Sequence, residues 1–427
     1  MYPVTSPVAG SIRWQCKARA PSECVANKIP GTASAVLEPV LLILATMAFL
    51  AWIISAAEMI VHRDAIPSLP ELPAGDREEL PSVSVIVAAR NEALTIAPAL
   101  RSLLDLDFPV LEVIVVNDRS TDATGEILDR ESRDRDRLRV VHLTTLPAGW
   151  LGKNHALQVA ADEAHGEWLL FTDADVIFHP LALRRAVAYA IDQRLDHLAV
   201  APTLLMKGIL LDLFAGAFAL LFSQFARPWL ARKPGSRFHI GIGAFNLVRA
   251  KAYRSVGGHR PISMRPDDDL RLGRILKQSG FRQAMAFGNG DVAVEWYSSI
   301  SEATRGLEKN SFAAFDYSLP RAVAGSCLLF LIGIFPFAGL FFTSGLALWL
   351  NILTSGLVIL LYAGSTRASG SKILMSPAFP LATLLVLFII ARATALTLLN
   401  DGISWRDTHY SLDELKQGAN DQKRGEM

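Results

Sequence analysis

Three acidic side chains stand at the ends of apolar, strand-like runs. Asp118 ends the run LEVIVVND, and Asp173 and Asp175 lie at the end of the run EWLLFTDAD. The carboxyl ends of parallel strands lie at one edge of a sheet, so these carboxylates can converge there. Converging carboxylates repel one another unless a cation is present, and hard oxygen ligands suit Mg²⁺ or Mn²⁺. The spacing therefore indicates a divalent metal site, with the alternative that Asp118 and Asp122 only begin a loop and cap a helix.

A second acidic group lies further along the chain. Asp267, Asp268 and Asp269 precede the amphipathic pattern LRLGRILKQSGF. Acidic residues at the start of a helix complement its dipole, which is one explanation for the group. Three adjacent carboxylates repel one another more than a helix cap requires. One of these carboxylates would supply the general base for a group transfer.

Other polar residues follow the first strand-like run and open a later helix. Arg90, Asn91 and Glu92 come directly after SVSVIVAA, at the same predicted edge of the sheet. Lys153 lies in GWLGKNHAL, a glycine-containing turn that opens a helix. A lysine beside free N–H groups suits a phosphate, although an ordinary surface lysine is the simpler explanation for this residue alone.

The segment 82–317 alternates short β-rich runs with helical patterns. This alternation predicts an α/β domain with a mostly parallel sheet and helices on both faces. The predicted strands lie at 82–89, 111–118, 137–143 and 167–175, and the predicted helices begin at Ala93, Asp122, Lys153 and Leu181. Such a sheet brings the candidate residues to one edge.

Apolar runs flank this domain on both sides. The run 37–57 is long enough to cross the hydrocarbon layer at about 1.5 Å per residue. No charged residue occurs from 322 to 366, which fits two spans that turn near 343–345, and a third run covers 373–391. The run 213–226 is shorter than a span and has a basic rim, so it predicts either an interfacial helix or a buried helix of the domain.

The predicted organisation therefore has six parts. They are a flexible tail (1–35), a transmembrane helix (36–61), a linker (62–81), the α/β domain (82–317), two or three C-terminal transmembrane helices (322–399) and a second tail (400–427). The net charge of +1 gives no basic surface that would indicate nucleic acid as a partner. Cys16, Cys24 and Cys327 form no CxxC pair, which indicates neither a structural zinc site nor a disulfide framework.

Six stretches together resemble the family 2 glycosyltransferases, which have the GT-A nucleotide-sugar fold. They follow the family's order: VSVIVAARNEA (83–93), VVNDRSTDAT (115–124), GWLGKNHAL (149–157), LLFTDADV (169–176), GAFNLVRAKAYRSVGGH (243–259) and PDDDLRLGRILKQSG (266–280). The flanking apolar runs and the segment GISWRDTHYSLDEL (402–415) further resemble a membrane-bound subgroup. That subgroup holds ceramide glucosyltransferases and the carotenoid and hopanoid-associated glycosyltransferases.

The resemblance implies how the donor would be bound. Arg90 and Glu92 would border the nucleotide base, and Asp118 would hold the uracil or ribose side. Lys153 would meet the base or the diphosphate. These roles come from the matching positions in the family motifs.

The resemblance also implies the residues for metal binding and catalysis. Asp173 would contact the ribose or the metal, and Asp175 would bind the Mg²⁺ or Mn²⁺ that bridges the diphosphate. Asp269, with Asp268 before it and Leu272 three residues later, matches the pattern of the catalytic base.

Two positions depart from the family pattern. Ala88 replaces the proline that commonly precedes the Arg-Asn-Glu segment. The Gln-x-x-Arg-Trp signature of processive polysaccharide synthases is missing, and the corresponding region reads ATRGLEKNSF (303–312). The second departure argues against a long polymer product.

The expected function is that of a membrane-bound, inverting hexosyltransferase. It would move a sugar from a nucleotide sugar, expected to be a UDP-sugar, to a lipid or polyprenoid acceptor. The catalytic domain is expected on the cytosolic face of the bilayer, at the inner or plasma membrane if the protein is bacterial. The alternatives are a processive polysaccharide synthase and a catalytically inactive membrane scaffold. If segment 402–415 belongs near the active site, one trailing apolar run must be re-entrant or interfacial.

Overall fold

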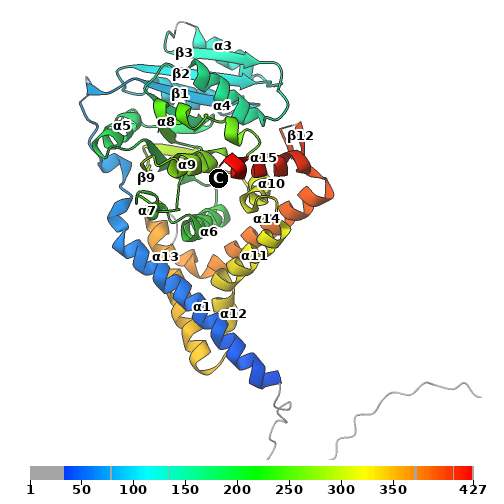
Figure 1. The fold of residues 1–427 in the computed structure, drawn as a ribbon. Helices are drawn as coiled ribbons and strands as arrows, with labels where there is room; N and C mark the ends of the chain where they lie inside the picture. Colours follow the sequence, from blue (N-terminus) through cyan, green and yellow to red (C-terminus); the bar gives the residue numbers. More distant parts are fainter. Residues whose placement is uncertain (1–32, 77–78, 134, 370–372, 407, 426–427) are drawn as a thin grey trace, which may run out of the picture.

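The computed structural model describes residues 33–425, apart from 77–78, 134, 370–372 and 407. Most of the tail predicted for residues 1–35 therefore lies outside the described residues. An α/β domain lies at one end of the molecule, and long apolar helices extend away from it (Figure 1).

A seven-stranded sheet with the order β3-β2-β1-β4-β8-β6-β9 forms the centre of the domain. The four strands predicted from the sequence are parallel neighbours within it. They are β1 (Val83–Ala89), β2 (Leu111–Asp118), β3 (Leu138–Leu143) and β4 (Trp168–Asp173). The prediction of a mostly parallel sheet is confirmed.

The other half of the sheet contains strands that the sequence patterns did not reveal. β8 (Asn246–Arg249) is antiparallel to both β4 and β6 (His197–Ala201), and β9 (Gln283–Phe287) is parallel to β6. A smaller sheet has the order β5-β10-β7, formed by β5 (Val176–Phe178), β10 (Val292–Glu295) and β7 (Thr203–Leu205).

Two apolar layers cover the sheet. Val83, Val85 and Val87 of β1 pack in the layer formed with α2 (Ile96–Leu104) and α5 (Ala182–Asp192). Ile86 packs in the layer formed with α4 (Gly152–Glu163), α8 (Ala250–Ser255) and α9 (Asp268–Gln278). Successive strand side chains point to opposite faces, which is why one strand serves both layers. The helices of the domain are α2 (Ile96–Leu104), α3 (Thr124–Ser132), α4 (Gly152–Glu163), α5 (Ala182–Asp192), α8 (Ala250–Ser255), α9 (Asp268–Gln278) and α10 (Ile300–Ser311).

The apolar helices outside the domain are α1 (Ala33–Val61), α11 (Leu319–Gly333), α12 (Phe335–Gly339), α13 (Gly345–Ser369) and α14 (Phe379–Leu399). Among the described residues, four helical segments are long and apolar enough to cross a membrane. They are Val36–Val61, Ile209–Ala231, Gly345–Gly364 and Ser376–Leu399. The segments Ile300–Phe315 and Leu319–Gly333 add a fifth candidate only if they form one span bent by 109°. The turn predicted near 343–345 is present, because α13 begins at Gly345.

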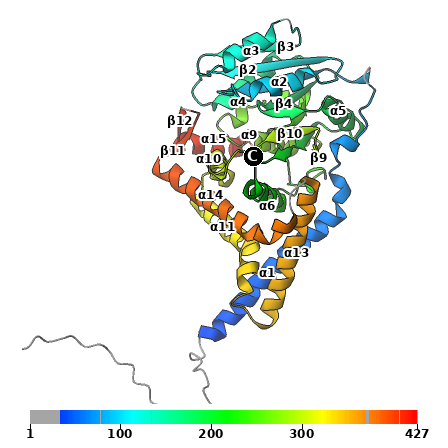
Figure 2. The same ribbon diagram turned by 180° about the vertical axis from the view of Figure 1, so that it is seen from behind.

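Helix α6 (Ile209–Ala226) contains the short apolar run whose role the sequence left open. It lies between the α/β domain and the apolar helices in both views (Figures 1 and 2). Leu213 and Leu220 pack with Trp52 of α1 and Phe379 of α14 in one apolar cluster. Together with α7 (Pro228–Ala231), helix α6 forms a segment long enough to span a membrane. This segment is longer than the apolar run 213–226 that the sequence indicated.

The segment after α14 returns to the α/β domain. It forms the hairpin of β11 (Gly402–Trp405) and β12 (Thr408–Ser411), followed by α15 (Leu412–Gly425). Ile403, Tyr410 and Leu415 are buried in a cluster with Leu151 and Phe312. The hairpin and α15 therefore pack on the domain, next to the start of α4.

Two glycines bring α9 into backbone contact with the loop before β8. A Cβ added at Gly273 would lie 1.8 Å from the carbonyl oxygen of Ile240. A Cβ added at Gly241 would lie 1.9 Å from the carbonyl oxygen of Asp269. Rotating a side chain cannot relieve a clash with a backbone atom. Helix α9, which carries Asp268 and Asp269, is thus fixed against this loop.

Gly273→Ala should lower the free energy of unfolding by at least the roughly 1–3 kcal/mol typical of overpacking, because the new methyl group meets a carbonyl oxygen. The midpoint of thermal unfolding of the full chain in detergent, followed by size-exclusion chromatography, measures the effect. Gly356→Ala in α13 is the control, since a Cβ there meets nothing within 4 Å. Equal midpoints for Gly273→Ala and the unaltered chain would contradict the close packing.

Candidate active site

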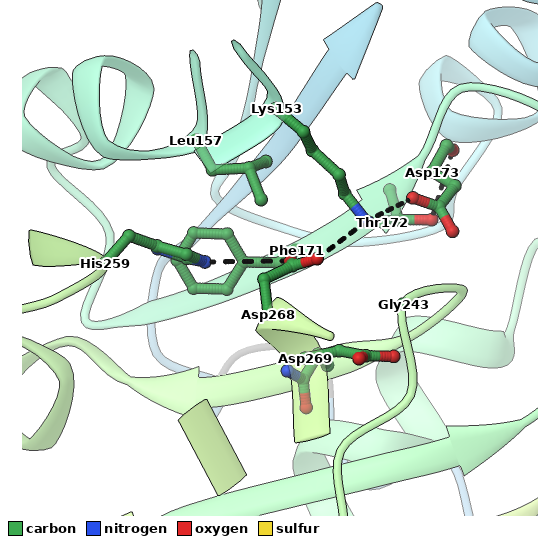
Figure 3. A pocket seen from close by; sticks show the side chains of 10 residues that line it. Lys153, Leu157, Phe171, Thr172, Asp173, Gly243, His259, Asp268 and Asp269 are labelled. Carbon is green, nitrogen blue, oxygen red and sulfur yellow. Dashed lines mark hydrogen bonds and ion pairs between the residues drawn. The ribbon is translucent and has the colours of Figure 1, made fainter. Parts of the chain in front are cut away.

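Lys153 occupies the centre of the site. It lies in the first turn of α4, with Nζ 2.9 Å from Asp173 Oδ1 and 3.4 Å from Asp268 Oδ1 (Figure 3). Burial alone would lower the pKa of Lys153, but the charges of Asp173, Asp268 and Asp269 raise it overall. The lysine therefore stays protonated and joins the acid at the end of β4 to the acids at the start of α9.

The two acids of α9 have different surroundings. Asp268 is buried, and its carboxylate lies between Lys153 and His259, whose Nε2 is 4.0 Å from Asp268 Oδ2. Burial and the charge of Lys153 lower the pKa of His259 to about 3, so this histidine is neutral. Burial and the neighbouring Asp268 raise the pKa of Asp269 to about 7. Asp269 therefore has the proton affinity of a base that works near neutral pH.

Gly243 lies beside the carboxylates of both Asp173 and Asp269. A Cβ added at Gly243 would lie 2.8 Å from Asp173 Oδ2 and 3.4 Å from Asp269 Oδ2. Lys153, Asp173, Gly243, Asp268 and Asp269 line one small cavity (Figure 3). The predicted metal-side acid and the predicted base therefore face the same space, although they are far apart in the sequence.

Asp175 lies in the tight turn between β4 and β5. Burial and the charges of Asp173 and Glu92 raise its pKa to about 7, and it forms no ion pair with another described residue. The described residues contain no group of three histidine, cysteine or acidic side chains placed to hold a metal ion. Mg²⁺ is often held by one or two carboxylates together with substrate phosphates and water. Asp173 and Asp175 fit that kind of site, in which the donor supplies further ligands.

Asp118 does not join this acidic pair, which corrects the expectation that all three carboxylates converge on a cation. Its Oδ1 lies 2.7 Å from Arg119 Nε and its Oδ2 lies 3.0 Å from Arg119 Nη2, in a two-pronged ion pair. Arg90 adds a second positive charge at 3.9 Å. Two arginines, rather than a metal ion, balance the charge of Asp118. Arg119 directly follows Asp118 in the sequence, and that adjacency was the signal that could have predicted the pair.

Asp122 has a structural role, although it is not the helix cap. Its side chain accepts hydrogen bonds from Thr124 N at 2.9 Å and from Ala93 N at 3.1 Å. Ala123 occupies the cap position of α3 and makes no side-chain cap bond. Asn91 adds a second link, because its Oδ1 accepts from Thr121 N at 2.8 Å. The loop that carries Arg90 and Glu92 is thereby tied to the loop after β2.

The C-terminal hairpin reaches the same edge of the domain, and the sequence motifs assigned none of its residues to the site. Arg406 donates a hydrogen bond to Glu92 Oε1. Gly152 N donates a hydrogen bond to the hydroxyl of Tyr410 at 3.3 Å. The sequence predicted free N–H groups at this turn for a phosphate, but this one is already occupied by Tyr410. Lys309 of α10 lies over the ring of Trp405, with Nζ 4.0 Å from the ring centre. The segment 402–415 is therefore part of the candidate active site.

Comparison with known proteins identifies the domain. Residues 84–257 match the family model described as Glycosyl transferase family 2. The chain contains a family 2 glycosyltransferase domain. Together with the sheet described above, this match identifies the α/β domain as a GT-A fold.

Several curated relatives resemble parts of this chain. Probable glycosyltransferase YdaM of Bacillus subtilis (strain 168) is 39% identical over 100 residues, which are 23% of this chain and 24% of that protein. Beta-monoglucosyldiacylglycerol synthase of Nostoc sp. is 37% identical over 98 residues, which are 22% of this chain and 20% of that protein. The matched segment thus spans about a fifth to a quarter of these two relatives.

Among solved structures, the chain is similar to the mannosyltransferase PcManGT from Pyrobaculum calidifontis, solved in complex with GDP-Man and Mn²⁺. The sequence identity is 19% and the TM-score is 0.49. The similarity covers 84% of this chain and 99% of that chain.

A buried ion-pair network holds the start of α9. Arg265 Nε lies 2.9 Å from Asp267 Oδ1, and Arg265 Nη1 lies 3.4 Å from Asp316 Oδ1. Arg271 contacts the same two acids, at 2.8 Å from Asp267 Oδ2 and 2.9 Å from Asp316 Oδ1. Because Asp267 directly precedes the two acids of the cavity, the network fixes their end of α9 against the segment before α11.

Arg265→Met should lower the free energy of unfolding by about 3–5 kcal/mol, because it leaves Asp267 and Asp316 buried with one fewer positive partner. Arg321→Met is the matched control. Arg321 also contacts Asp316, but its side chain is 54% exposed, so the loss should stay below about 1 kcal/mol. Chemical unfolding of both full-length variants in detergent compares them. Similar losses for the two variants would refute a special role for the buried arginine.

Proposed function

We propose that this chain is a membrane-bound inverting glycosyltransferase that moves a hexose from a nucleotide sugar to the hydroxyl group of a lipid or polyprenoid. The observation that carries the proposal is the cavity in which Asp173 and Asp269 face one another across Gly243, with Lys153 between Asp173 and Asp268. In this proposal Asp173 serves the donor side of the transfer and Asp269 serves the acceptor side.

The acceptor side of the reaction uses Asp269 as the general base. The acceptor hydroxyl attacks the anomeric carbon while its proton passes to the Asp269 carboxylate. The raised pKa of Asp269 suits this step, because a base works best when its proton affinity is near the operating pH. A single in-line displacement inverts the anomeric centre, so an α-linked donor gives a β-glycoside.

The donor side must stabilise the leaving nucleotide diphosphate. A divalent cation, Mg²⁺ or Mn²⁺, held by Asp175 and Asp173 would stabilise the negative charge that develops on the diphosphate. Lys153 keeps Asp173 in place and adds a fixed positive charge next to it. Asp118 would contact the nucleoside, with Arg90 and Glu92 bordering the base at the same edge of the sheet. A UDP-sugar is the proposed donor.

A lipid acceptor is supported by the apolar surroundings of the site. The ring centre of Phe218 in α6 lies 5.0 Å from that of Trp296, and Phe214 and Phe222 lie next to it along the same helix. Tyr297 extends this group of rings, because its ring centre lies 4.9 Å from that of Trp296. Burial raises the pKa of Tyr297, and the charges of Glu302, Asp173 and Asp175 add to the effect. A lipid tail can stay on this apolar side while its hydroxyl reaches Asp269. The name of the Nostoc relative, beta-monoglucosyldiacylglycerol synthase, also supports a glycolipid product.

The apolar helices support attachment to a bilayer, and we place the catalytic domain on the cytosolic side, where nucleotide sugars are generally found. A processive synthase is the second candidate. It is favoured by a relative named poly-beta-1,6-N-acetyl-D-glucosamine synthase of Staphylococcus epidermidis, 30% identical over 102 residues. Product length separates the two candidates, since a glycolipid synthase adds one or a few sugars.

A donor screen tests the proposed function. The purified chain in lipid is expected to release nucleotide from one UDP-sugar when lipid extract is added, and to lose this activity in EDTA. Added Mg²⁺ or Mn²⁺ should restore it. Asp175→Asn should abolish transfer without changing the unfolding midpoint, because an amide oxygen is a poorer metal ligand. Full activity in EDTA would rule out the metal assignment, and no activity with any donor would favour an inactive scaffold.

Asp269→Asn separates the base from the donor site. Transfer should fall by about 10²–10⁴, the usual cost of removing a general base, while the affinity for nucleotide diphosphate stays near normal. Rapid quench measurement of transfer and calorimetric titration of nucleotide give the two quantities. Asp268→Asn is the comparison, because Asp268 is held by Lys153. A mild effect of Asp269→Asn beside a severe effect of Asp268→Asn would show that Asp268 is the base instead.

A further inference from the structure

The basic loop, residues 232–239, follows directly after α7 and concentrates positive charge. It reads RKPGSRFH and contains no acidic residue. The side chains of Arg232, Lys233 and Arg237 are exposed. None of these three forms an ion pair with an acidic side chain in the part of the chain that the structure describes, and Arg232 instead donates to the hydroxyl of Tyr189. The loop therefore presents positive charge that no described acid neutralises.

A contact with α1 fixes the level of the basic loop relative to the apolar helices. Glu58, near the end of the candidate span Val36–Val61, has its Oε1 3.1 Å from Arg227 Nη1 and accepts a hydrogen bond from Trp229 Nε1 at 3.3 Å. The candidate span Ile209–Ala231 therefore ends beside the end of α1, on the side of the α/β domain (Figure 1). In the proposed bilayer, this is the level of the lipid headgroups.

Hydrogen bonds hold the basic loop at both of its ends. Lys277 Nζ of α9 donates to the carbonyl oxygen of Ala231 at 2.6 Å and to that of Lys233 at 2.7 Å. Directly after the loop, Ile240 N donates to Gln283 Oε1 at 2.8 Å. The exposed basic side chains are thus carried on an ordered backbone, which lowers the entropy that a binding event must offset.

We propose that the basic loop binds anionic phospholipid headgroups at the surface of the bilayer that holds the apolar helices. This inference rests on the proposed attachment to a bilayer and goes beyond the proposed function, which requires no charged lipid. Basic side chains near a bilayer surface are attracted to anionic lipids, and the attraction grows with each added charge. Because Lys277 bonds the loop to α9, the same contact keeps the helix that carries Asp268 and Asp269 close to the lipid surface.

Native mass spectrometry of the full chain in neutral detergent tests the proposal, with dioleoylphosphatidylglycerol and dioleoylphosphatidylcholine as the titrated lipids. The unaltered chain should bind phosphatidylglycerol more tightly than phosphatidylcholine. The double variant Lys233→Gln, Arg237→Gln should weaken phosphatidylglycerol binding about twenty-five-fold, which corresponds to roughly five-fold for each basic residue near the surface. Its binding of phosphatidylcholine should stay unchanged.

The double variant Arg133→Gln, Arg137→Gln is the matched control. It also removes two exposed basic side chains, but these lie just before β3, at the end of the domain that points away from the apolar helices (Figure 2). The control should bind phosphatidylglycerol like the unaltered chain. If the glutamine pair in the basic loop lowers the thermal unfolding midpoint, Lys233→Arg with Arg237→Lys keeps both charges and should retain phosphatidylglycerol binding.

Three results would overturn the proposal. They are equal affinity of the unaltered chain for the two lipids, equal losses of phosphatidylglycerol binding in the basic-loop variant and the control, and displacement of phosphatidylglycerol by millimolar inorganic phosphate. The last result would indicate a site for free phosphate rather than for a lipid surface. Lipid binding is measured without donor or acceptor. Absence of transfer by the unaltered chain would therefore refute the proposed function alone, and absence of selective lipid binding would refute this inference alone.

Discussion

The repulsion between carboxylates enclosed in a small space is the constraint around which the site is built. Asp173, Asp268 and Asp269 line one cavity, and without a positive charge their ionised forms would push one another apart. Lys153 supplies that charge, with contacts at 2.9 and 3.4 Å to two of the three acids. The lysine comes from α4, whereas the acids come from β4 and α9. One ion-pair centre therefore joins three elements and sets their relative positions.

Other features of the domain keep this arrangement rigid. The absence of side chains at Gly241 and Gly273 lets α9 touch the loop before β8, which places Asp269 beside Gly243. The buried pair of Arg265 and Arg271 holds Asp267, so the start of α9 cannot rotate easily. Within the described part of the chain Asp269 forms no ion pair, and burial together with the charge of Asp268 raises its pKa in spite of the nearby Lys153. The proposed base therefore owes its raised pKa to burial and to the charge of Asp268, while Lys153 makes its close contacts with Asp173 and Asp268.

The sequence allowed prediction of the parts of the fold that repeat a simple pattern. The four parallel strands and their helices show clear changes of hydrophobic period, and their predicted ends place Asp118, Asp173 and Asp175 correctly at the edge of the sheet. The antiparallel strand β8 could not be predicted in this way, because four residues are too few to show a period. The partner of Asp118 was also missed, because an acid next to an arginine can pair with it or with a bound cation, and the adjacency alone does not decide between the two. The role of Tyr410 depends on a contact with Gly152 that no local pattern encodes.

The position of the C-terminal hairpin has a consequence for how the protein is made. Arg406 touches Glu92, and every apolar helix from α11 to α14 lies between these two residues in the chain. A ribosome therefore completes the α/β domain well before it produces the segment that contacts the edge of its sheet. Those contacts form only after the intervening helices have been synthesised and have taken up an arrangement that returns the chain to the domain. The contact between Arg406 and Glu92 thus depends on the arrangement of all the helices that are made between them.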